Sequence, residues 1–263
     1  MLDAGRVVWP PMSRTLVVVP TLGRRTDYLR ASLRSIRGAG DATILLVAPA
    51  AFDAGDLIAE GLADAKSDER VPGLAAAINQ GFAEAGPEVD YLAWLGDDDL
   101  LRPGSIERSV AFLATHPRTV ATYGACDYIG PDGEPVWVNR SGWWAAPLLR
   151  VGPDLIPQPG SVFRRSAVDA IGPLREDLGW AFDFDFFIRL SKSGRLSYLG
   201  ETVAAFRWHP DSLSVRERSQ SVREASEVRV AHLPRWLRPV SGLWEAPVRW
   251  ATMRAAGLVK TGR

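Results

Sequence analysis

The sequence predicts an α/β protein with a mostly parallel sheet flanked by helices, followed by a helical C-terminal extension. Short apolar runs alternate with amphipathic segments through the first 118 residues, an order typical of parallel strands joined by right-handed helical crossovers. The apolar runs lack polar alternation, as expected of strands that are covered on both faces. A chain of 263 residues with 46% hydrophobic residues suits one such domain with an appendage.

The first half of the chain contains three strand–helix units. The strands are expected at residues 16–19, 43–48 and 91–95. Each is followed by a segment with apolar residues at three- or four-residue steps, which indicates a helix with one buried face. These helices are expected at residues 26–37, 73–85 and 105–115.

The second half is predicted to be less regular. A hairpin is expected over residues 119–138, with its turn at Pro131-Asp132-Gly133. Residues 141–160 are rich in Trp, Gly and Pro, which favours a loop. Further helices are expected at residues 166–171, 184–193 and 219–230, and a strand is expected at residues 202–208.

Composition excludes several classes of protein. The formal net charge is zero, which argues against a nucleic-acid binder. Cys126 is the single cysteine, so the chain has neither an internal disulfide nor a cysteine metal site, and a reducing cytoplasm fits. No apolar run is long enough for a spanning helix. The start lacks signal-peptide features, and Met12 is an alternative first residue.

Three aspartates, Asp97, Asp98 and Asp99, directly follow the third strand. Ligands bind at the carboxyl ends of strands in open α/β sheets, and adjacent carboxylates repel one another unless a cation compensates. Asp97 and Asp99 can point the same way and hold a hard cation, Mg²⁺ or Mn²⁺. The alternative is a solvated turn. A calcium loop fits poorly, because its fifth and twelfth positions would be Leu101 and Arg108.

The order of motifs resembles the inverting nucleotide-sugar glycosyltransferases of family two, which have the GT-A fold. Residues 20–24 resemble the family's P-T-x-x-R opening, residues 73–81 its G-x-x-x-A-x-N-x-G helix, and residues 94–101 its DxD metal motif. Residues 183–189 resemble the stretch that carries the catalytic base, and residues 208–214 resemble the late H-x-x-S-x-S element. Together the number, order and spacing of these motifs carry the resemblance.

This resemblance implies a GT-A-like catalytic domain at residues 14–216. Its nucleotide-sugar-binding half is expected at 14–118 and its acceptor half at 119–216. Residues 1–13 are expected to be a disordered leader, and residues 217–263 a helical extension. The implied reaction moves a hexosyl or deoxyhexosyl group from a nucleotide-diphosphate donor to a hydroxyl of a glycan or lipid-linked glycan, with inversion.

The resemblance also assigns roles at the metal and the donor. Asp97 and Asp99 are the expected metal ligands, with Asp98 as the alternative partner of Asp99 because Gly96 shifts the carboxylates relative to the family motif. His209 is expected to be a further metal or phosphate ligand. The alternative is that it is a structural or surface histidine. The residues expected at the donor are Pro20, Thr21, Arg24, Asn79, Asp97 and Asp98. The alternatives are that Thr21 and Arg24 form a turn at the start of a helix and that Asn79 is a helix-packing residue.

On the acceptor side, Asp183 is the predicted general base, and its aromatic surroundings favour a raised pKa. The alternative is that Asp183 caps a helix starting at Phe184. Trp143, Trp144 and Gln158 are expected to contact the acceptor, since sugars stack on aromatic rings and hydrogen-bond to amides. A loop that merely packs on the core is the competing interpretation.

Three positions depart from the family pattern. Residues 46–50 (LVAPA) lack the aspartate that commonly recognises uracil, so a thymidine or guanosine diphosphate sugar is a candidate donor. Ile78 stands in place of an arginine, and Phe182 replaces the acidic residue before Asp183. Two rival functions are a nucleotidyltransferase of similar fold and a degenerate glycan-binding module. A nucleotidyltransferase is expected to have a glycine-rich, basic phosphate loop after the first strand, whereas residues 20–25 contain only one glycine.

The C-terminal tail is basic and rich in tryptophan. From Arg235 to Arg263 there are six basic residues and one acid, with three tryptophans among apolar residues. This composition is typical of a segment in a membrane interface, which would give a cytoplasmic protein with peripheral contact at the inner face of the membrane. The competing interpretation is that the tryptophans dock on the catalytic domain.

Overall fold

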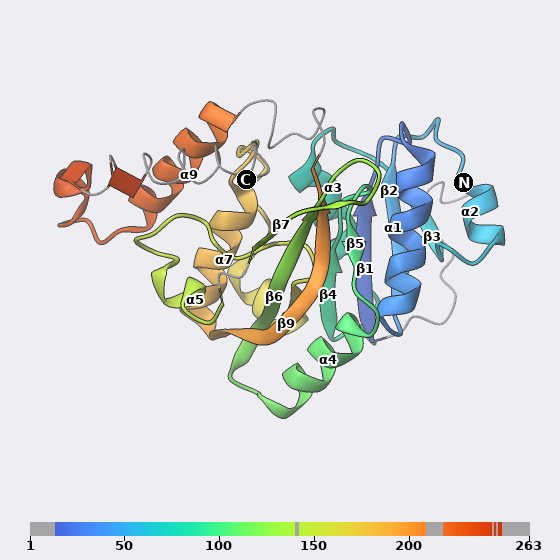
Figure 1. Cartoon of the computed structure of the whole chain (residues 1–263), viewed down its shortest axis with the longest axis horizontal. Helices are drawn as coiled ribbons and strands as arrows, with labels where there is room; N and C mark the ends of the chain where they lie inside the picture. Colours follow the sequence, from blue (N-terminus) through green and yellow to red (C-terminus); the bar gives the residue numbers. More distant parts are fainter. Residues whose placement is uncertain (1–13, 140–141, 209–217, 244, 246, 249–263) are drawn as a thin grey trace, which may run out of the picture.

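The computed structural model describes residues 14–139, 142–208, 218–243, 245, 247 and 248 (Figure 1). One mixed sheet runs through the molecule in the order β3-β2-β1-β4-β8-β6-β9-β5, and β7 pairs with β6. The strands are β1 (Thr15–Pro20), β2 (Thr43–Ala48), β3 (Ala65–Asp68), β4 (Tyr91–Trp94), β5 (Leu100–Leu101), β6 (Thr119–Ile129), β7 (Pro135–Asn139), β8 (Val162–Arg164) and β9 (Arg195–Arg207). The helices are α1 (Thr26–Ala39), α2 (Gly55–Ala59), α3 (Leu74–Ala83), α4 (Ser105–Thr115), α5 (Ala145–Leu148), α6 (Arg165–Ile171), α7 (Phe182–Ser193), α9 (Arg218–His232) and the short 3₁₀ helix η1 (Arg238–Val240).

The half of the sheet formed by residues 14–118 is largely parallel, as the sequence predicts. Strand β1 lies between β2 and β4, and β3 continues this parallel array beyond β2. The other half is mixed, because β8 runs antiparallel between β4 and β6 while β9 runs parallel to β6. The expectation of a mostly parallel sheet holds for the first half and for the long β6–β9 pair, whereas the pairs made by β5, β7 and β8 are antiparallel. A strand reached through a long loop carries no local signal of its direction.

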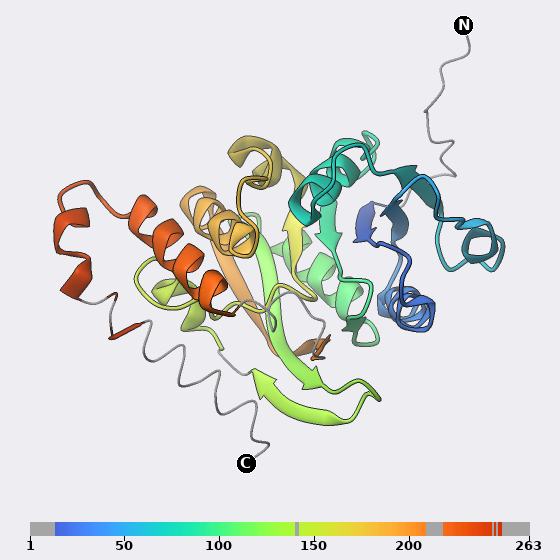
Figure 2. The same ribbon diagram turned by 90° about the horizontal axis from the view of Figure 1, so that it is seen from above.

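Helices cover both faces of the sheet (Figures 1 and 2). Alternate residues of a strand point to opposite faces, and β1 follows this rule: Leu16 and Val18 pack with α3 and α7, whereas Val17 and Val19 pack with α1 and α4. All six residues of β1 are buried. The alternation creates two apolar layers and explains why the strand sequences are continuously hydrophobic.

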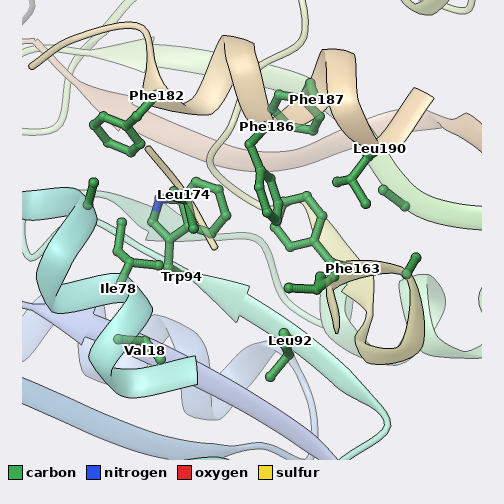
Figure 3. Packing of buried hydrophobic residues seen from close by; sticks show 14 of the residues in the cluster. Val18, Ile78, Leu92, Trp94, Phe163, Leu174, Phe182, Phe186, Phe187 and Leu190 are labelled. Carbon is green, nitrogen blue, oxygen red and sulfur yellow. The ribbon is translucent and has the colours of Figure 1, made fainter. Parts of the chain in front are cut away.

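An aromatic cluster fastens α7 to the centre of the sheet (Figure 3). Trp94 at the end of β4 stacks on Phe163 of β8 with ring centroids 5.1 Å apart, and Phe186 of α7 meets Trp94 edge-on at 5.8 Å. Phe182 is buried in the same cluster. The phenylalanine that departs from the family pattern thus packs the first turn of α7 onto the strand that leads to the three aspartates.

The boundaries of several elements differ from those expected. Helix α7 begins at Phe182 and not at Phe184, and β9 begins at Arg195 and not at residue 202. The elements α2 and β3 were not expected at all. Strand β3 (AKSD) lies at the edge of the sheet and pairs with β2 through its backbone, so its sequence has no apolar pattern that could reveal it.

Helix α9 lies beside α7 (Figure 2), and Val228 of α9 is buried in the core cluster that includes α7. The segment that follows α9 also contacts α9 through Glu245. Glu245 is buried and forms an ion pair with Arg229 of α9, with Oε1 2.6 Å from Nε. Within the described residues, none of the helices is long and apolar enough to cross a membrane.

Candidate active site

The carboxyl ends of β1 and β4 meet at one edge of the sheet, because Val18 and Trp94 are register partners in parallel neighbours. Pro20 ends β1 and is buried. The Thr21 hydroxyl donates a hydrogen bond of 2.5 Å to Asp97 Oδ2. The loops that follow the two strands are thereby tied together, which brings the predicted donor-binding residues Thr21 and Asp97 into contact.

Arginines surround Asp98. Arg25 Nη1 lies 3.0 Å from Asp98 Oδ2, and Arg207 Nε donates to the Asp98 carbonyl oxygen at 3.0 Å. The neighbouring Arg24, which the sequence favoured as the donor-binding arginine, is exposed. The sequence analysis identified neither Arg25 nor Arg207 as a partner of Asp98. Arg25 is adjacent to the arginine of the family motif, and Arg207 lies at the end of a strand more than a hundred residues from Asp98.

Asp99 is the most buried of the three aspartates, with 5% of its surface exposed. Its Oδ1 accepts the backbone N–H of Arg207 at 3.0 Å. Burial raises the pKa of the Asp99 carboxyl well above its ordinary value, and the Asp98 and Asp97 charges raise it further. The cluster therefore has an excess of negative potential that a cation would relieve.

Gly96 lies directly beside the carboxylates of Asp98 and Asp99. A Cβ atom at this position would lie 2.9 Å from Asp99 Oδ2 and 3.1 Å from Asp98 Oδ1, so both oxygens lie on the same side of Gly96 and no side chain fits beneath them. Within the described residues, no group of three or more His, Cys, Asp or Glu side chains is arranged to hold a metal by itself. Carboxylate oxygens supplemented by diphosphate and water still suit a hard divalent cation. The predicted ligand His209 lies outside the described residues.

Asp183 occupies the second position of α7, and the N-cap is Ala181, which provides no side-chain cap. The Asp183 side chain accepts the N–H of Phe184 through Oδ1 at 2.8 Å. Loss of hydration raises the pKa of Asp183 to about 6; hydrogen bonds from the backbone oppose the shift, and the charge of Glu224 adds to it. A carboxyl group with this pKa is suited to accept a proton near neutral pH.

Asp154 is a second carboxylate near Asp183, and the sequence analysis missed it. The residue as a whole is exposed, yet its carboxyl group is poorly hydrated. This loss of hydration raises the pKa of Asp154 well above its ordinary value, and the Asp183 charge raises it further. Asp154 follows Gly-Pro in a loop, so only the folded chain brings it near α7.

The other predicted acceptor and donor residues differ in their surroundings. Trp143 and Trp144 are 74% and 41% exposed beside α5, as a contact with a sugar would require. The Gln158 amide donates to the Trp94 carbonyl oxygen at 3.0 Å. The Asn79 amide joins α3 to the loop before α7: its Nδ2 donates to the Leu174 carbonyl oxygen at 2.9 Å and its Oδ1 accepts the Leu174 N–H at 2.8 Å.

An open hollow of about 470 Å³ lies at the carboxyl ends of β2 and β3. Lys66 and Asp68 of β3 form an ion pair of 2.8 Å there. The hollow adjoins the segment that lacks the expected aspartate after β2. It is lined by residues 50–55, Ile58, Lys66 and Asp68, so acidic groups reach it from Asp53 and Asp68 instead.

The fold and the site together define an α/β protein whose polar site lies at the carboxyl ends of parallel strands, with a poorly hydrated carboxylate on a helix of the second half. Residues 16–171 match the sequence profile described as Glycosyl transferase family 2. The chain belongs to this family of glycosyltransferases. No curated protein matches the sequence.

Two solved structures illustrate the likeness in fold. Residues 1–349 of TarS from S. aureus share 16% identity with this chain at a TM-score of 0.59, over 89% of this chain and 71% of TarS 1–349. The mannosyltransferase PcManGT from Pyrobaculum calidifontis, in complex with GDP-Man and Mn²⁺, shares 17% identity at a TM-score of 0.60, over 97% of this chain and 79% of its own. The GT-A-like fold expected from the motifs is thereby confirmed.

Proposed function

We propose that this glycosyltransferase transfers a sugar, with inversion, from a nucleotide-diphosphate donor to a hydroxyl of a glycan or lipid-linked glycan. The observation that carries the proposal is the pairing of two different carboxylate sites. Asp98 and Asp99 converge over Gly96 at the end of β4, and Asp183 lies poorly hydrated at the start of α7. Trp94 and Phe186 link the two sites through the aromatic cluster.

Asp98 and Asp99 are the proposed ligands of a divalent metal, Mg²⁺ or Mn²⁺. Their converging oxygens favour this pair over Asp97 and Asp99, while the contact of Asp97 with Thr21 favours a role for Asp97 beside the nucleotide. When bound, the metal would stabilise the negative charge that develops on the departing diphosphate. A neighbour of similar fold is in complex with Mn²⁺. His209 remains a predicted additional ligand.

Asp183 is the proposed general base. The acceptor oxygen attacks the anomeric carbon and forms the new glycosidic bond, the bond from that carbon to the diphosphate oxygen breaks, and the acceptor proton passes to the Asp183 carboxylate. Attack opposite the leaving group inverts the anomeric centre. The exposed Trp143 and Trp144 are proposed to stack on acceptor sugars.

The hollow between β2 and β3 is the proposed site of the donor base. The TarS structures include complexes with UDP and UDP-GlcNAc, whereas PcManGT is in complex with GDP-Man. Here residues 46–50 contain no aspartate, and the carboxylates that line the hollow are Asp53 and Asp68. Because the aspartate that commonly recognises uracil is missing from residues 46–50, a thymidine or guanosine diphosphate sugar is the proposed donor. A carboxylate in the hollow can accept the N1–H and N2–H₂ groups of guanine or the N3–H of thymine.

The experiment that tests this function is a transfer assay with matched UDP, dTDP and GDP sugars, in the presence of Mn²⁺ and a panel of glycan acceptors. We expect a product with the anomeric configuration opposite to that of the donor, assigned by NMR. A product with retained configuration, or no transfer and no donor hydrolysis with any nucleotide sugar, would overturn the proposal. A strong and exclusive preference for UDP sugars would overturn only the assignment of the base.

A further inference from the structure

Glu224 of α9 binds the backbone just before the proposed catalytic base. Its Oε1 accepts the N–H of Gly179 at 2.9 Å, and its Oε2 accepts the N–H groups of Trp180 and Ala181, each at 2.6 Å. Asp183 is two residues further along. One carboxylate from the C-terminal extension therefore satisfies three consecutive amides at the start of α7.

The amides that Glu224 binds belong to Ala181, which is the N-cap of α7, and to the two residues before it. The first N–H groups of a helix have no partner inside the helix, and a side chain at the N-cap usually accepts one of them. The N-cap here is Ala181, which has no side-chain acceptor. Carboxylates bind such amides strongly because the hydrogen bonds are charge-assisted and the positive end of the helix dipole lies there.

Other contacts hold α9 in place independently of Glu224. Arg229 makes two hydrogen bonds to Glu245, at 2.6 and 2.9 Å, and donates to the Gly152 carbonyl oxygen at 2.7 Å. Near the end of α9, His232 Nε2 lies 2.7 Å from Asp185 Oδ1. Helix α9 is thus fixed to α7 and to the loop that carries Asp154, and Glu224 projects from a firmly held support.

We propose that Glu224 is a positioning residue for sugar transfer, which holds residues 179–181 so that Asp183 faces the acceptor hydroxyl. This inference rests on the proposed role of Asp183 as the base. It assigns the C-terminal extension a part in the reaction, in addition to its packing. A small misplacement of a reacting group is enough to reduce turnover strongly, because catalysis requires near-attack geometry.

The charge of Glu224 gives the proposal a readout that packing alone would not produce. Among the described residues, the charge of Glu224 of α9 acts on Asp183, and the charges of Asp183 and of Arg229 of α9 act on Asp154 in the loop before β8. The negative charge of Glu224 raises the pKa of Asp183. Removal of this charge should therefore lower the pKa of the base and extend activity to lower pH.

The test compares Glu224→Gln with wild type, with Asp183→Asn and with the matched control Glu227→Gln, which changes an exposed glutamate on the same helix. For Glu224→Gln we expect kcat to fall roughly 10- to 100-fold with donor KM nearly unchanged, because the geometry at the base is altered. The acid limb of kcat/KM should shift to lower pH. Hydrogen exchange should accelerate at least about 10-fold in the peptide that covers residues 179–184.

Each outcome bears on the inference. If exchange at residues 179–184 accelerates while kcat and the pH profile stay as in wild type, Glu224 is only structural and the inference is wrong. If exchange does not change, the hydrogen bonds do not hold the segment and the inference is also wrong. If Asp183→Asn retains wild-type turnover, the proposed base is wrong, and this result separates a failure of the proposed function from a failure of Glu224 alone.

Discussion

The two carboxylate sites of this molecule have different partners. At the end of β4, Asp97 accepts a hydrogen bond from the Thr21 hydroxyl, Asp98 pairs with Arg25, and Asp99 is buried beside them. At the start of α7, loss of hydration raises the pKa of Asp183 to about 6, the charge of Glu224 adds to this shift, and hydrogen bonds from the backbone oppose it. Asp154 is a neighbouring acid. Different chemistry follows, because one site suits a cation and a diphosphate and the other suits proton transfer.

Removal of a carboxylate at the first site should give the largest effect. We expect Asp98→Asn to reduce metal-stimulated turnover by about 10³-fold or more, since stabilisation of the leaving group contributes several kcal/mol. The measurements are Mn²⁺-dependent donor binding by calorimetry and kcat over a range of metal concentrations. Asp97→Asn is the matched variant and should retain metal binding. Equal loss of metal binding in both variants would contradict the pairing of Asp98 with Asp99.

Removal of the carboxylate at the second site should affect only the chemical step. Asp183→Asn preserves shape and cannot accept the proton, so we expect a loss of about 10²-fold or more in kcat, within the range for general base catalysis. Binding of nucleotide diphosphate should be nearly unchanged. Parallel loss of donor binding and turnover would assign Asp183 to structure or to donor recognition, and the contrast between the two sites would disappear.

The pH dependence should sharpen the contrast. The base acts when deprotonated, and its pKa is raised to about 6, so kcat/KM should fall as the pH drops through 6 and be constant above it. The profile is measured at saturating metal, with circular dichroism at each pH to confirm folding. An acid limb near pH 4, the ordinary value for an aspartate, would contradict the poorly hydrated environment of Asp183.

The smallest expected effect concerns the extension, in which a buried residue lies close in sequence to exposed apolar side chains. Glu245 is buried in an ion pair, whereas Trp236 and Leu243 are 75% and 80% exposed. We expect weak, salt-sensitive flotation of the full-length chain with anionic liposomes, because the exposed Trp lies among basic residues. The double variant Trp236→Ser, Leu243→Ser should bind less and keep its melting temperature. Equal flotation of both proteins would show that this surface does not contact the membrane.

Much of the first half could be predicted from the sequence. The strands β1, β2 and β4 are short and apolar throughout, and the helices between them have one apolar face, so their identity and order follow from local patterns. The position of the three aspartates follows from the same reasoning, because they are adjacent to β4 in the chain. Edge strand β3 could not be predicted, since its residues form no apolar pattern and backbone pairing to β2 defines it.

The sequence by itself determined the parallel strands of the first half, the family motifs and the acidic cluster, because each depends on residues close together in the chain. Only the tertiary structure decided which groups surround the carboxylates. Arg207 lies 108 residues after Asp99, and Glu224 lies 43 residues after Ala181, yet both make direct hydrogen bonds to these partners. Hydration and charge at a carboxyl group depend on all of its spatial neighbours, and no local pattern of residues encodes neighbours so distant in the chain.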